Sequence, residues 1–454
     1  MKKYLTLLLI IISGQLALAF DVVYPKKTEV TINSPTTFFI GSSDLPLTIN
    51  GENIDIHSST GFAYFTDLKE GKNIFELKTS KETKTYQIYR PKSISAKSTY
   101  TRPKPTEYAK PLWLVNETEK APLRSTPVDA GINRLAHLPE GVELIADGEV
   151  SGFYRINLGG NKKGYISKNY VKPISTSLMG TLKSYEFVHE KEFYKYVFHL
   201  NKKVPFEITE GETFKLNLYN IKNYPDEIYT FEFPYEILSG SKKIYGYDGQ
   251  YNGNDFILRI RKPLKINPKH PLKGIKITID AGHGGKEYGA TGCLGDKEKN
   301  IVLKIANYLK EELNELGANV IMTRDDDSYM NLYERVDKTN ENNSSIFISI
   351  HANALPDSLN PLTHRGTSVY YYYPQAKELA GNILVAMNTD LGTQNDKVRQ
   401  ESFAVVRNTS AISVLLETAY LINPEDNAML IDDEFQKNCA KAIAKGISNY
   451  LKAK

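Results

Sequence analysis

Four side chains in the C-terminal part of this 454-residue chain have the types that metal-dependent hydrolysis needs: His283, Glu298, His351 and Glu417. Two imidazoles and one carboxylate are the usual protein ligands of a catalytic zinc that keeps one coordination position open. A further carboxylate is what such a site needs to accept a proton from water. These residue types therefore indicate a zinc-dependent hydrolase acting on an amide.

Three of the four groups follow segments with strand patterns. Residues 275–280, shortly before His283, alternate apolar and polar residues, whereas residues 346–350 and 412–416, directly before His351 and Glu417, are nearly continuous apolar runs typical of buried strands. Parallel strands bring their carboxyl ends to one edge of a sheet, and open α/β sheets bind ligands at that edge. We therefore expect these three groups to lie close together.

Glu298 stands at the start of a predicted helix, because apolar residues recur at spacings of three and four from Val302 to Leu316 and Gly317 ends the pattern. Further strands are predicted at 318–322 and 368–373, and further helices at 332–340, 376–391 and 435–451. This alternation predicts an α/β domain over residues 274–454, with a mostly parallel sheet covered by helices.

Blocks of sequence in this region closely resemble the zinc-dependent N-acetylmuramoyl-L-alanine amidases of bacterial cell-wall turnover. The blocks are residues 280–285 (DAGHGG), 289–292 leading to 298–300, 323–324, 349–354 (SIHANA) and 416–423 (LETAYLIN). Carried over by position, the resemblance implies that His283, Glu298 and His351 bind Zn²⁺ and that Glu417 is the catalytic glutamate. It also implies cleavage of the amide between N-acetylmuramic acid and the first L-alanine of the peptidoglycan stem.

Two other functions are compatible with the same fold: a catalytically inactive wall-binding or regulatory protein, and a zinc peptidase acting on stem peptides. The presence of all four groups favours the enzyme over an inactive relative, and the order of the blocks disfavours the peptidase. Arg324 and Arg335 are interpreted as structural, paired with residues 325–327 or with Glu334.

The first 19 residues have the pattern of a signal peptide. Lys2 and Lys3 precede an apolar run at 5–12, and Ala17-Leu18-Ala19 supplies a cleavage pattern. A membrane anchor is the alternative, but the run is shorter than the roughly 20 residues that span a bilayer. We therefore expect an exported protein, periplasmic or extracellular and associated with the wall, with no membrane span after signal removal.

The charge and the two cysteines bear on two further questions, namely whether the chain binds nucleic acid and whether it contains a disulfide bond. The formal net charge is +4, with 57 basic and 53 acidic residues, which offers no electrostatic basis for binding nucleic acid. Cys293 and Cys439 could pair in an oxidising compartment, but Cys439 lies in a helical apolar pattern and is more simply a core residue.

The region before the catalytic domain is predicted to hold three all-β modules. Residues 20–90 resemble a bacterial immunoglobulin-like sandwich, residues 112–174 resemble a bacterial Src-homology-3-like barrel, and residues 178–266 weakly resemble a β-rich domain that targets amidases to the wall. Prolines mixed with Lys, Ser and Thr mark residues 91–111 as a linker. The barrel could bind sugar or peptide or only pack against its neighbours, and the β-rich domain could be a spacer.

The chain lacks the insertion that covers the zinc in some members of the resembled family. After residues 370–373 a helical pattern begins almost at once, and residues 355–365 contain two prolines and are interpreted as an exposed loop. We therefore predict an open groove and an enzyme that needs no activator protein.

Overall fold

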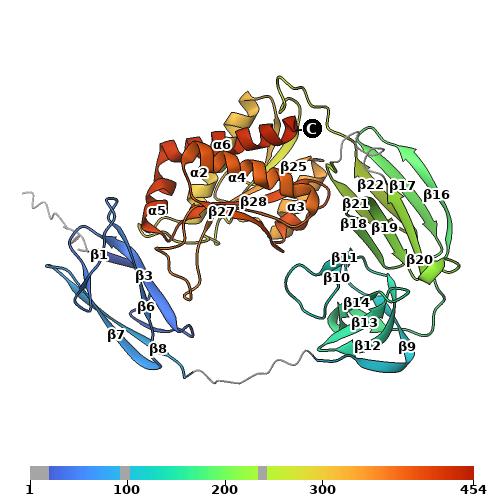
Figure 1. Ribbon diagram of the computed structural model, residues 1–454, viewed down its shortest axis with the longest axis horizontal. Helices are drawn as coiled ribbons and strands as arrows, with labels where there is room; N and C mark the ends of the chain where they lie inside the picture. The colour runs from blue at the N-terminus through green and yellow to red at the C-terminus, as the bar shows by residue number, and fades with distance from the viewer. Residues whose placement is uncertain (1–19, 93–102, 234–242, 454) are drawn as a thin grey trace, which may run out of the picture.

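The structure is a computed structural model that describes residues 20–92, 103–233 and 243–453. The predicted signal peptide and much of the predicted linker lie outside these residues. In Figure 1 the C-terminal domain, yellow-orange to red, lies between a blue N-terminal β module and a green β-rich domain, with the predicted barrel region, hereafter called the barrel, under the latter. Within the described ranges, no helix combines the length and the apolar composition that crossing a membrane requires.

The C-terminal domain is built on a six-stranded sheet with the order β24-β23-β25-β28-β26-β27. The strands are β23 (Lys276–Ala281), β24 (Asn319–Met322), β25 (Ile346–Asn353), β26 (Thr367–Tyr371), β27 (Asn395–Gln400) and β28 (Ile412–Tyr420). Strands β24, β23, β25 and β28 are parallel, while β26 is antiparallel to β28. The predicted α/β class and mostly parallel sheet are therefore present.

The helices are distributed unequally over the two faces of this sheet. They are α2 (Glu298–Glu315), α3 (Leu332–Glu341), α4 (Lys377–Leu391), α5 (Pro424–Ile431) and α6 (Asp433–Lys452). Helices α2, α4 and α6 share one buried cluster with Ile348 and Val414 of the sheet. Phe347 and Leu415 belong to a second cluster with Val405 and Val406 of the short helix η4 (Val405–Arg407). Since neighbouring strand residues point to opposite faces, these central strands carry apolar residues on both faces.

The N-terminal module contains a three-stranded and a five-stranded sheet, ordered β1-β3-β6 and β2-β8-β7-β4-β5. Its strands are β1 (Phe20–Tyr24), β2 (Glu29–Thr31), β3 (Thr36–Ser43), β4 (Thr48–Ile49), β5 (Glu52–Asn53), β6 (Gly61–Asp67), β7 (Gly71–Lys78) and β8 (Thr83–Arg90). Phe39, Leu77 and Ile88 are fully buried between the sheets.

The next β region forms one seven-stranded sheet, ordered β11-β10-β14-β13-β12-β9-β15. Its strands are β9 (Thr106–Asn116), β10 (Ala121–Arg124), β11 (Arg134–Leu138), β12 (Glu143–Val150), β13 (Phe153–Asn157), β14 (Lys163–Ser167) and β15 (Val171–Pro173). Strand β9 begins at Thr106, so the ordered β structure extends into the predicted linker.

The β-rich region before the catalytic domain has a four-stranded sheet, β16-β17-β22-β21, and a three-stranded sheet, β18-β19-β20. The strands are β16 (Leu182–His189), β17 (Phe193–Leu200), β18 (Phe206–Glu210), β19 (Phe214–Tyr219), β20 (Ile228–Phe233), β21 (Tyr247–Asn252) and β22 (Asp255–Arg261). One continuous hydrophobic cluster joins it to the seven-stranded sheet, with Leu138 and Val142 on one side and Val204 and Phe206 on the other. The two regions therefore pack as one unit.

The loop at residues 355–365, predicted to be exposed, is partly covered by the N-terminal module. The hydroxyl groups of Tyr24 and Thr37 each donate to Asp357 Oδ1 at 2.8 Å, and Thr36 donates to the Asp357 carbonyl at 2.8 Å. For Asp357 the prediction was wrong, because the sequence pattern of a loop contains no information on which distant module docks against it.

Phe38 and Ile40 of β3 extend the same contact. They share a buried cluster with Cys293 and Ile422 of the catalytic domain. Cys293 and Cys439 are both buried and unpaired, so the structure contains no disulfide between them.

A carboxyl group lies at the contact between the β-rich region and the catalytic domain. Glu210 Oε2 accepts a hydrogen bond from the Gln375 amide at 2.7 Å, and Glu210 Oε1 accepts one from the Tyr247 hydroxyl at 3.1 Å. Burial raises the pKa of Glu210 to about 7.

Cys293 provides a test of the N-terminal contact. In the native full-length chain we expect Cys293 to resist a thiol reagent, because β3 and β6 cover it. Phe38→Glu should make it react at least about tenfold faster, since a charge in this apolar contact favours opening. Peptide mapping by mass spectrometry would locate the label. Ile74→Glu, on a side chain that is 55% exposed, is the control and should leave Cys293 protected. Equal labelling in both variants would contradict the docked arrangement.

Glu210 predicts a specific pH dependence. Between its usual pKa of 4.5 and about 7, the folded chain keeps a proton on Glu210 that the unfolded chain releases. Stability should therefore fall as pH rises through this window and level off above it. Glu210→Gln should flatten this part of a plot of Tm against pH, whereas Glu212→Gln, at an exposed position, should not. An unchanged profile in Glu210→Gln would show that Glu210 titrates normally.

Candidate active site

The register of the sheet brings the candidate residues to one edge. His351 of β25 and Glu417 of β28 are directly paired across adjacent parallel strands. His283 follows β23, which lies on the other side of β25, and Glu298 is the first residue of α2. The predicted meeting of these groups at the carboxyl edge is therefore present in the structure.

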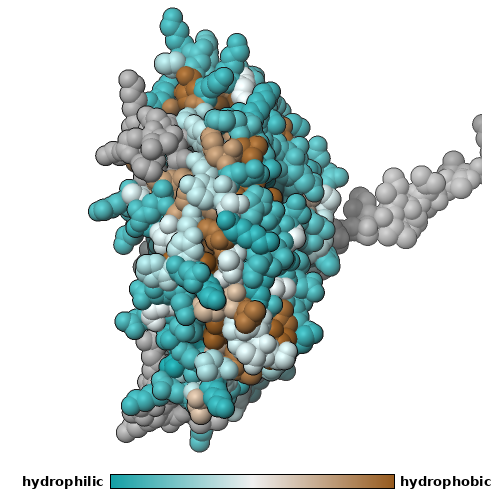
Figure 2. Space-filling model, turned by 90° about the vertical axis from the view of Figure 1, so that its right-hand side faces the viewer, coloured by the Kyte–Doolittle hydropathy of each residue, from teal (hydrophilic) through white to brown (hydrophobic). Residues whose placement is uncertain are grey.

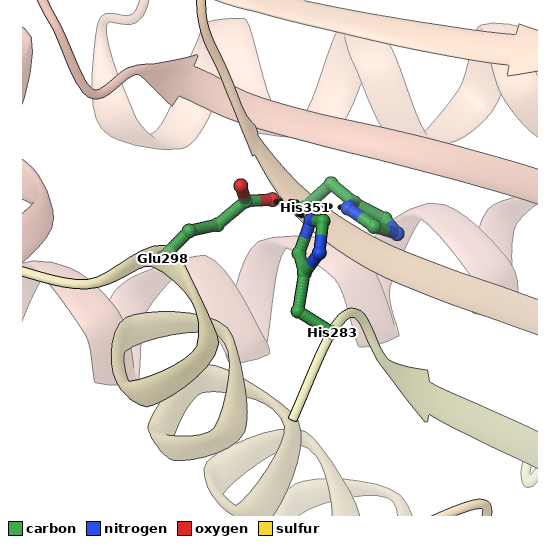
Figure 3. A group of neighbouring side chains, drawn as sticks. All are labelled: His283, Glu298 and His351. Atoms are coloured by element: carbon green, nitrogen blue, oxygen red, sulfur yellow. Dashed lines mark hydrogen bonds and ion pairs between the residues drawn. The ribbon is translucent and has the colours of Figure 1, made fainter. Parts of the chain in front are cut away.

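Glu298 lies between the two histidines, and the three side chains point toward one another in Figure 3. Its Oε1 atom is 3.0 Å from His283 Nε2 and 3.0 Å from His351 Nδ1. The candidate ligand atoms all lie within 4.8 Å of one another, and no other described residues form such a group. Two nitrogens and one carboxylate oxygen are the donor set of an open zinc site.

The Glu298 carboxylate is also held by the backbone. Oε2 accepts a hydrogen bond from the Ala290 amide at 2.8 Å, and Oε1 accepts one from the Ala352 amide at 3.1 Å. Burial opposes ionisation, but hydrogen bonds from His283 and His351 outweigh it and lower the pKa of Glu298 below its ordinary value. The carboxylate is therefore charged and oriented for binding a cation.

Two glycines allow the backbone to come close to His351 and Glu298. A Cβ atom at Gly282 would lie 2.3 Å from the His351 ring, and one at Gly289 would lie 2.3 Å from Glu298 Oε2. His283 itself has φ +59°, a left-handed conformation that is uncommon for residues other than glycine. Such local strain is typical of positions that the surrounding structure constrains for function.

Glu417 lies beside this group, and among the described residues its buried oxygen has no cationic or hydrogen-bonding partner. Its Oε2 atom is buried and has no hydrogen-bond partner. Burial, together with the negative charge of Glu298, raises the pKa of Glu417 well above its ordinary value. A carboxyl group with this environment is suited to accept and return a proton.

The four groups line one pocket of about 900 Å³. Its walls are formed by two segments, residues 329–333 and 403–405, together with residues 352–354 after His351. Tyr333 and Phe403 are 59% and 41% exposed, so the walls present aromatic surface to a ligand. The pocket is therefore larger than a metal site alone requires.

A buried ion pair supports the turn that carries His283. Asp280 Oδ1 accepts hydrogen bonds from Arg335 at 2.6 Å and from Thr323 at 2.7 Å, and its Oδ2 accepts one from Ser349 at 2.7 Å. Arg335 also donates to the His283 carbonyl at 2.8 Å. Asp280 was overlooked as a site residue, although a carboxylate at the end of an apolar strand was a usable signal.

The predicted partner was wrong for Arg335 and only partly right for Arg324. Arg335 pairs with Asp280 and not with Glu334. Arg324 donates to the carbonyl groups of Ala281 and Gly282, and it meets the 325–327 segment only at the Asp326 carbonyl. Both arginines remain structural, but they support the His283 turn because the glycine-rich backbone leaves carbonyl groups without partners there.

An α/β domain with two histidines and a glutamate at its sheet edge defines the class of protein, and comparison with known proteins gives the family. The family model for N-acetylmuramoyl-L-alanine amidase matches residues 277–449. The probable cell wall amidase LytH of Staphylococcus epidermidis is 38% identical over 184 residues, which cover 40% of this chain and 60% of that protein. LytH of Staphylococcus saprophyticus is 34% identical over 218 residues, covering 48% and 70%.

Solved structures are also similar to this chain. The amidase AmiC2 of Nostoc punctiforme is 36% identical, covers 40% of this chain and 99% of its own, and has a TM-score of 0.38. The CwlD amidase of Clostridioides difficile, described in complex with the GerS lipoprotein, is 29% identical, with coverages of 39% and 98% and a TM-score of 0.36. Because the Staphylococcus saprophyticus relative is 34% identical and is covered over 70% of its length, the chain belongs to the N-acetylmuramoyl-L-alanine amidase family, as the family match also indicates.

The Asp280–Arg335 pair allows a stability test. Asp280→Asn should cost about 3–5 kcal/mol, because it leaves the Arg335 guanidinium, whose side chain is 3% exposed, buried without a counter-charge. Urea denaturation of the full chain would measure this loss. Lys445→Met, which breaks the more exposed pair with Asp390, is the control and should cost less than about 1 kcal/mol. Equal losses in the two variants would argue against the supporting role of Asp280.

Proposed function

We propose that this chain is an exported peptidoglycan amidase that hydrolyses the bond between N-acetylmuramic acid and L-alanine. The observation that carries the proposal is the arrangement of His283, Glu298 and His351 beside a buried, unpartnered Glu417 oxygen. Family membership supports the substrate class. Because the aligned region is 60% of the length of the first LytH relative, the substrate and activity of the whole protein are part of this proposal.

The donor set fits zinc, and His283, Glu298 and His351 would hold it. The left-handed turn at His283 and the lack of a side chain at Gly289 allow the two histidines and the carboxylate to converge. Bound zinc supplies positive charge that polarises an amide carbonyl and makes a water molecule acidic enough to attack near neutral pH.

Glu417 would act as the base and then as the acid. Its raised pKa suits it to take a proton from the attacking water and to return that proton to the leaving amine. The aromatic walls of the pocket would hold the substrate in place during both steps.

The β-rich region offers a surface for wall binding. Tyr185 and Phe187 on its edge strand β16 are 51% and 40% exposed. Figure 2, which views the right-hand side of Figure 1, shows hydrophobic residues gathered in patches on a largely hydrophilic face. Aromatic rings in such a setting suit contact with sugar rings. Co-sedimentation of residues 20–266 with insoluble peptidoglycan would test this role, and failure to sediment would reduce the region to a spacer.

The pocket also supports activity without an activator protein. Its lining comes from the catalytic domain alone among the described residues. We therefore propose that the full chain is active by itself. A zinc-loaded chain that stayed inert until another protein was added would refute this.

Metal analysis would test the proposed ligands. The purified chain should contain about one zinc, and His351→Ala should lose both zinc and activity, because a two-ligand site binds the metal far more weakly. His270→Ala changes an exposed histidine and should behave as the wild type. Retention of zinc and full activity in His351→Ala would refute the assignment.

Glu417→Gln separates metal binding from catalysis. Glutamine preserves the shape of the side chain but cannot accept a proton, so zinc should remain while kcat falls by about 100-fold or more. Turnover should be measured by mass spectrometry of the new amino termini released from peptidoglycan. Glu341→Gln, at an exposed position in α3, is the matched control. Near-normal turnover in Glu417→Gln would place the base elsewhere.

A further inference from the structure

Two arginines at the contact between the barrel and the catalytic domain carry charge that no described carboxylate balances. Arg134 begins β11, and Arg407 ends η4. Neither takes part in any ion pair among the described residues. This distinguishes them from Arg124 and Arg155 of the barrel, which pair with Asp129 and Asp147.

The two guanidinium groups meet at one residue. Arg134 Nη1 donates to Ser402 Oγ at 2.6 Å, and Arg407 Nη1 donates to the Ser402 carbonyl and lies 3.4 Å from Ser402 Oγ. Arg134 Nε is buried without a hydrogen-bond partner. Desolvation and the neighbouring charge of Arg134 lower the pKa of Arg407. Two like charges and an unused donor in one place favour a bound anion.

His137 of β11 reinforces this conclusion. Desolvation, followed by the charges of Arg134 and Arg407, lowers the pKa of His137 to about 4. The imidazole is therefore neutral near neutral pH, because burial disfavours its charged form and the neighbouring cations add to that effect. Among the cations that act on His137, Arg124 and Lys120 pair with Asp129 and Asp337, whereas Arg134 and Arg407 pair with no described carboxylate.

The cluster adjoins the active-site pocket. Ser402 and Arg407 flank residues 403–405, which form one wall of the pocket. On another wall, Tyr333 lies 5.8 Å from Lys120 of the barrel, measured from its ring centroid. Two walls of the pocket therefore adjoin the barrel, while the described lining itself belongs to the catalytic domain.

We propose that Arg134 and Arg407 form a subsite for a carboxylate of the peptide stem. The proposal rests on the proposed amidase function, since an amide placed at Glu417 directs the peptide along the groove toward its free C-terminal carboxylate. Guanidinium groups bind carboxylates through paired, charge-assisted hydrogen bonds. The barrel is then a substrate-binding element of the catalytic site, which the sequence left undecided.

The wild-type full chain, loaded with zinc, tests this without any variant. It should be given two muropeptides that differ only at the stem terminus, one with a free carboxylate and one with a C-terminal amide. We expect KM to be about tenfold lower for the carboxylate, the size of one lost charge-assisted contact, with a similar kcat. Added salt should raise KM for the carboxylate substrate only.

Variants identify the residues. Arg134→Gln and Arg407→Gln should each raise KM for the carboxylate substrate toward that of the amide, and leave kcat and the amide substrate nearly unchanged. Arg134→Lys keeps the charge and should retain most of the preference. Arg155→Gln is the matched control, because this barrel arginine already pairs with Asp147, and it should have no effect.

The possible outcomes are distinct. Equal KM values for the two substrates in the wild type would overturn the subsite. Equal losses of activity on both substrates in the variants would also overturn it, and would point to a structural role or to another anion such as phosphate. Cleavage of neither substrate by the zinc-loaded chain would refute the proposed amidase function instead.

Discussion

The buried negative charge of Glu298 is the constraint on which the candidate active site depends. A carboxylate removed from water needs compensating donors, and here they come from His283, His351 and two backbone amides. The donors come from three segments, namely the turn after β23 (His283), the end of β25 (His351 and Ala352) and the loop before α2 (Ala290), so the charge ties the start of α2 to the ends of β23 and β25. The close approach of Gly282 and Gly289 follows from the same requirement.

The two glutamates of the site have opposite environments. Histidine donors lower the pKa of Glu298, whereas burial without a partner raises that of Glu417. Neighbouring carboxyl groups whose pKa values are pushed apart are typical of sites in which one binds a cation and the other transfers protons. Because His351 and Glu417 are paired residues on adjacent strands, the sheet register sets their separation. The rigid sheet therefore supplies the precision that the chemistry requires.

The modules before the catalytic domain make direct contacts with it. The N-terminal sandwich holds the loop after His351 through Asp357, and the barrel reaches the pocket rim through Arg134 and Lys120. The β-rich region contacts the catalytic domain through Glu210. Contacts of this kind combine buried apolar side chains with few, specific hydrogen bonds, as interfaces between domains usually do.

The catalytic domain shows how much of the structure local sequence patterns can predict. Strong periodicity predicted α2 from its first residue, alternation of apolar and polar residues predicted β23, and nearly continuous apolar runs predicted β25 and β28. Strand β27 was not predicted, because an edge strand with one apolar residue in NDKVRQ has no buried face to mark it. Short motifs with a chemical reason for every residue made His283, Glu298, His351 and Glu417 recognisable from residue type and spacing.

The sequence by itself thus determined the α/β class, the order of the elements and the identity of the candidate site residues, because these depend on residue type and short-range periodicity. Only the tertiary structure decided that Arg335 pairs with Asp280, that Asp357 binds the N-terminal module, and that Arg134 meets Arg407. Those contacts join residues tens to hundreds of positions apart. They depend on how whole surfaces fit together, and no local pattern in a single chain encodes that fit.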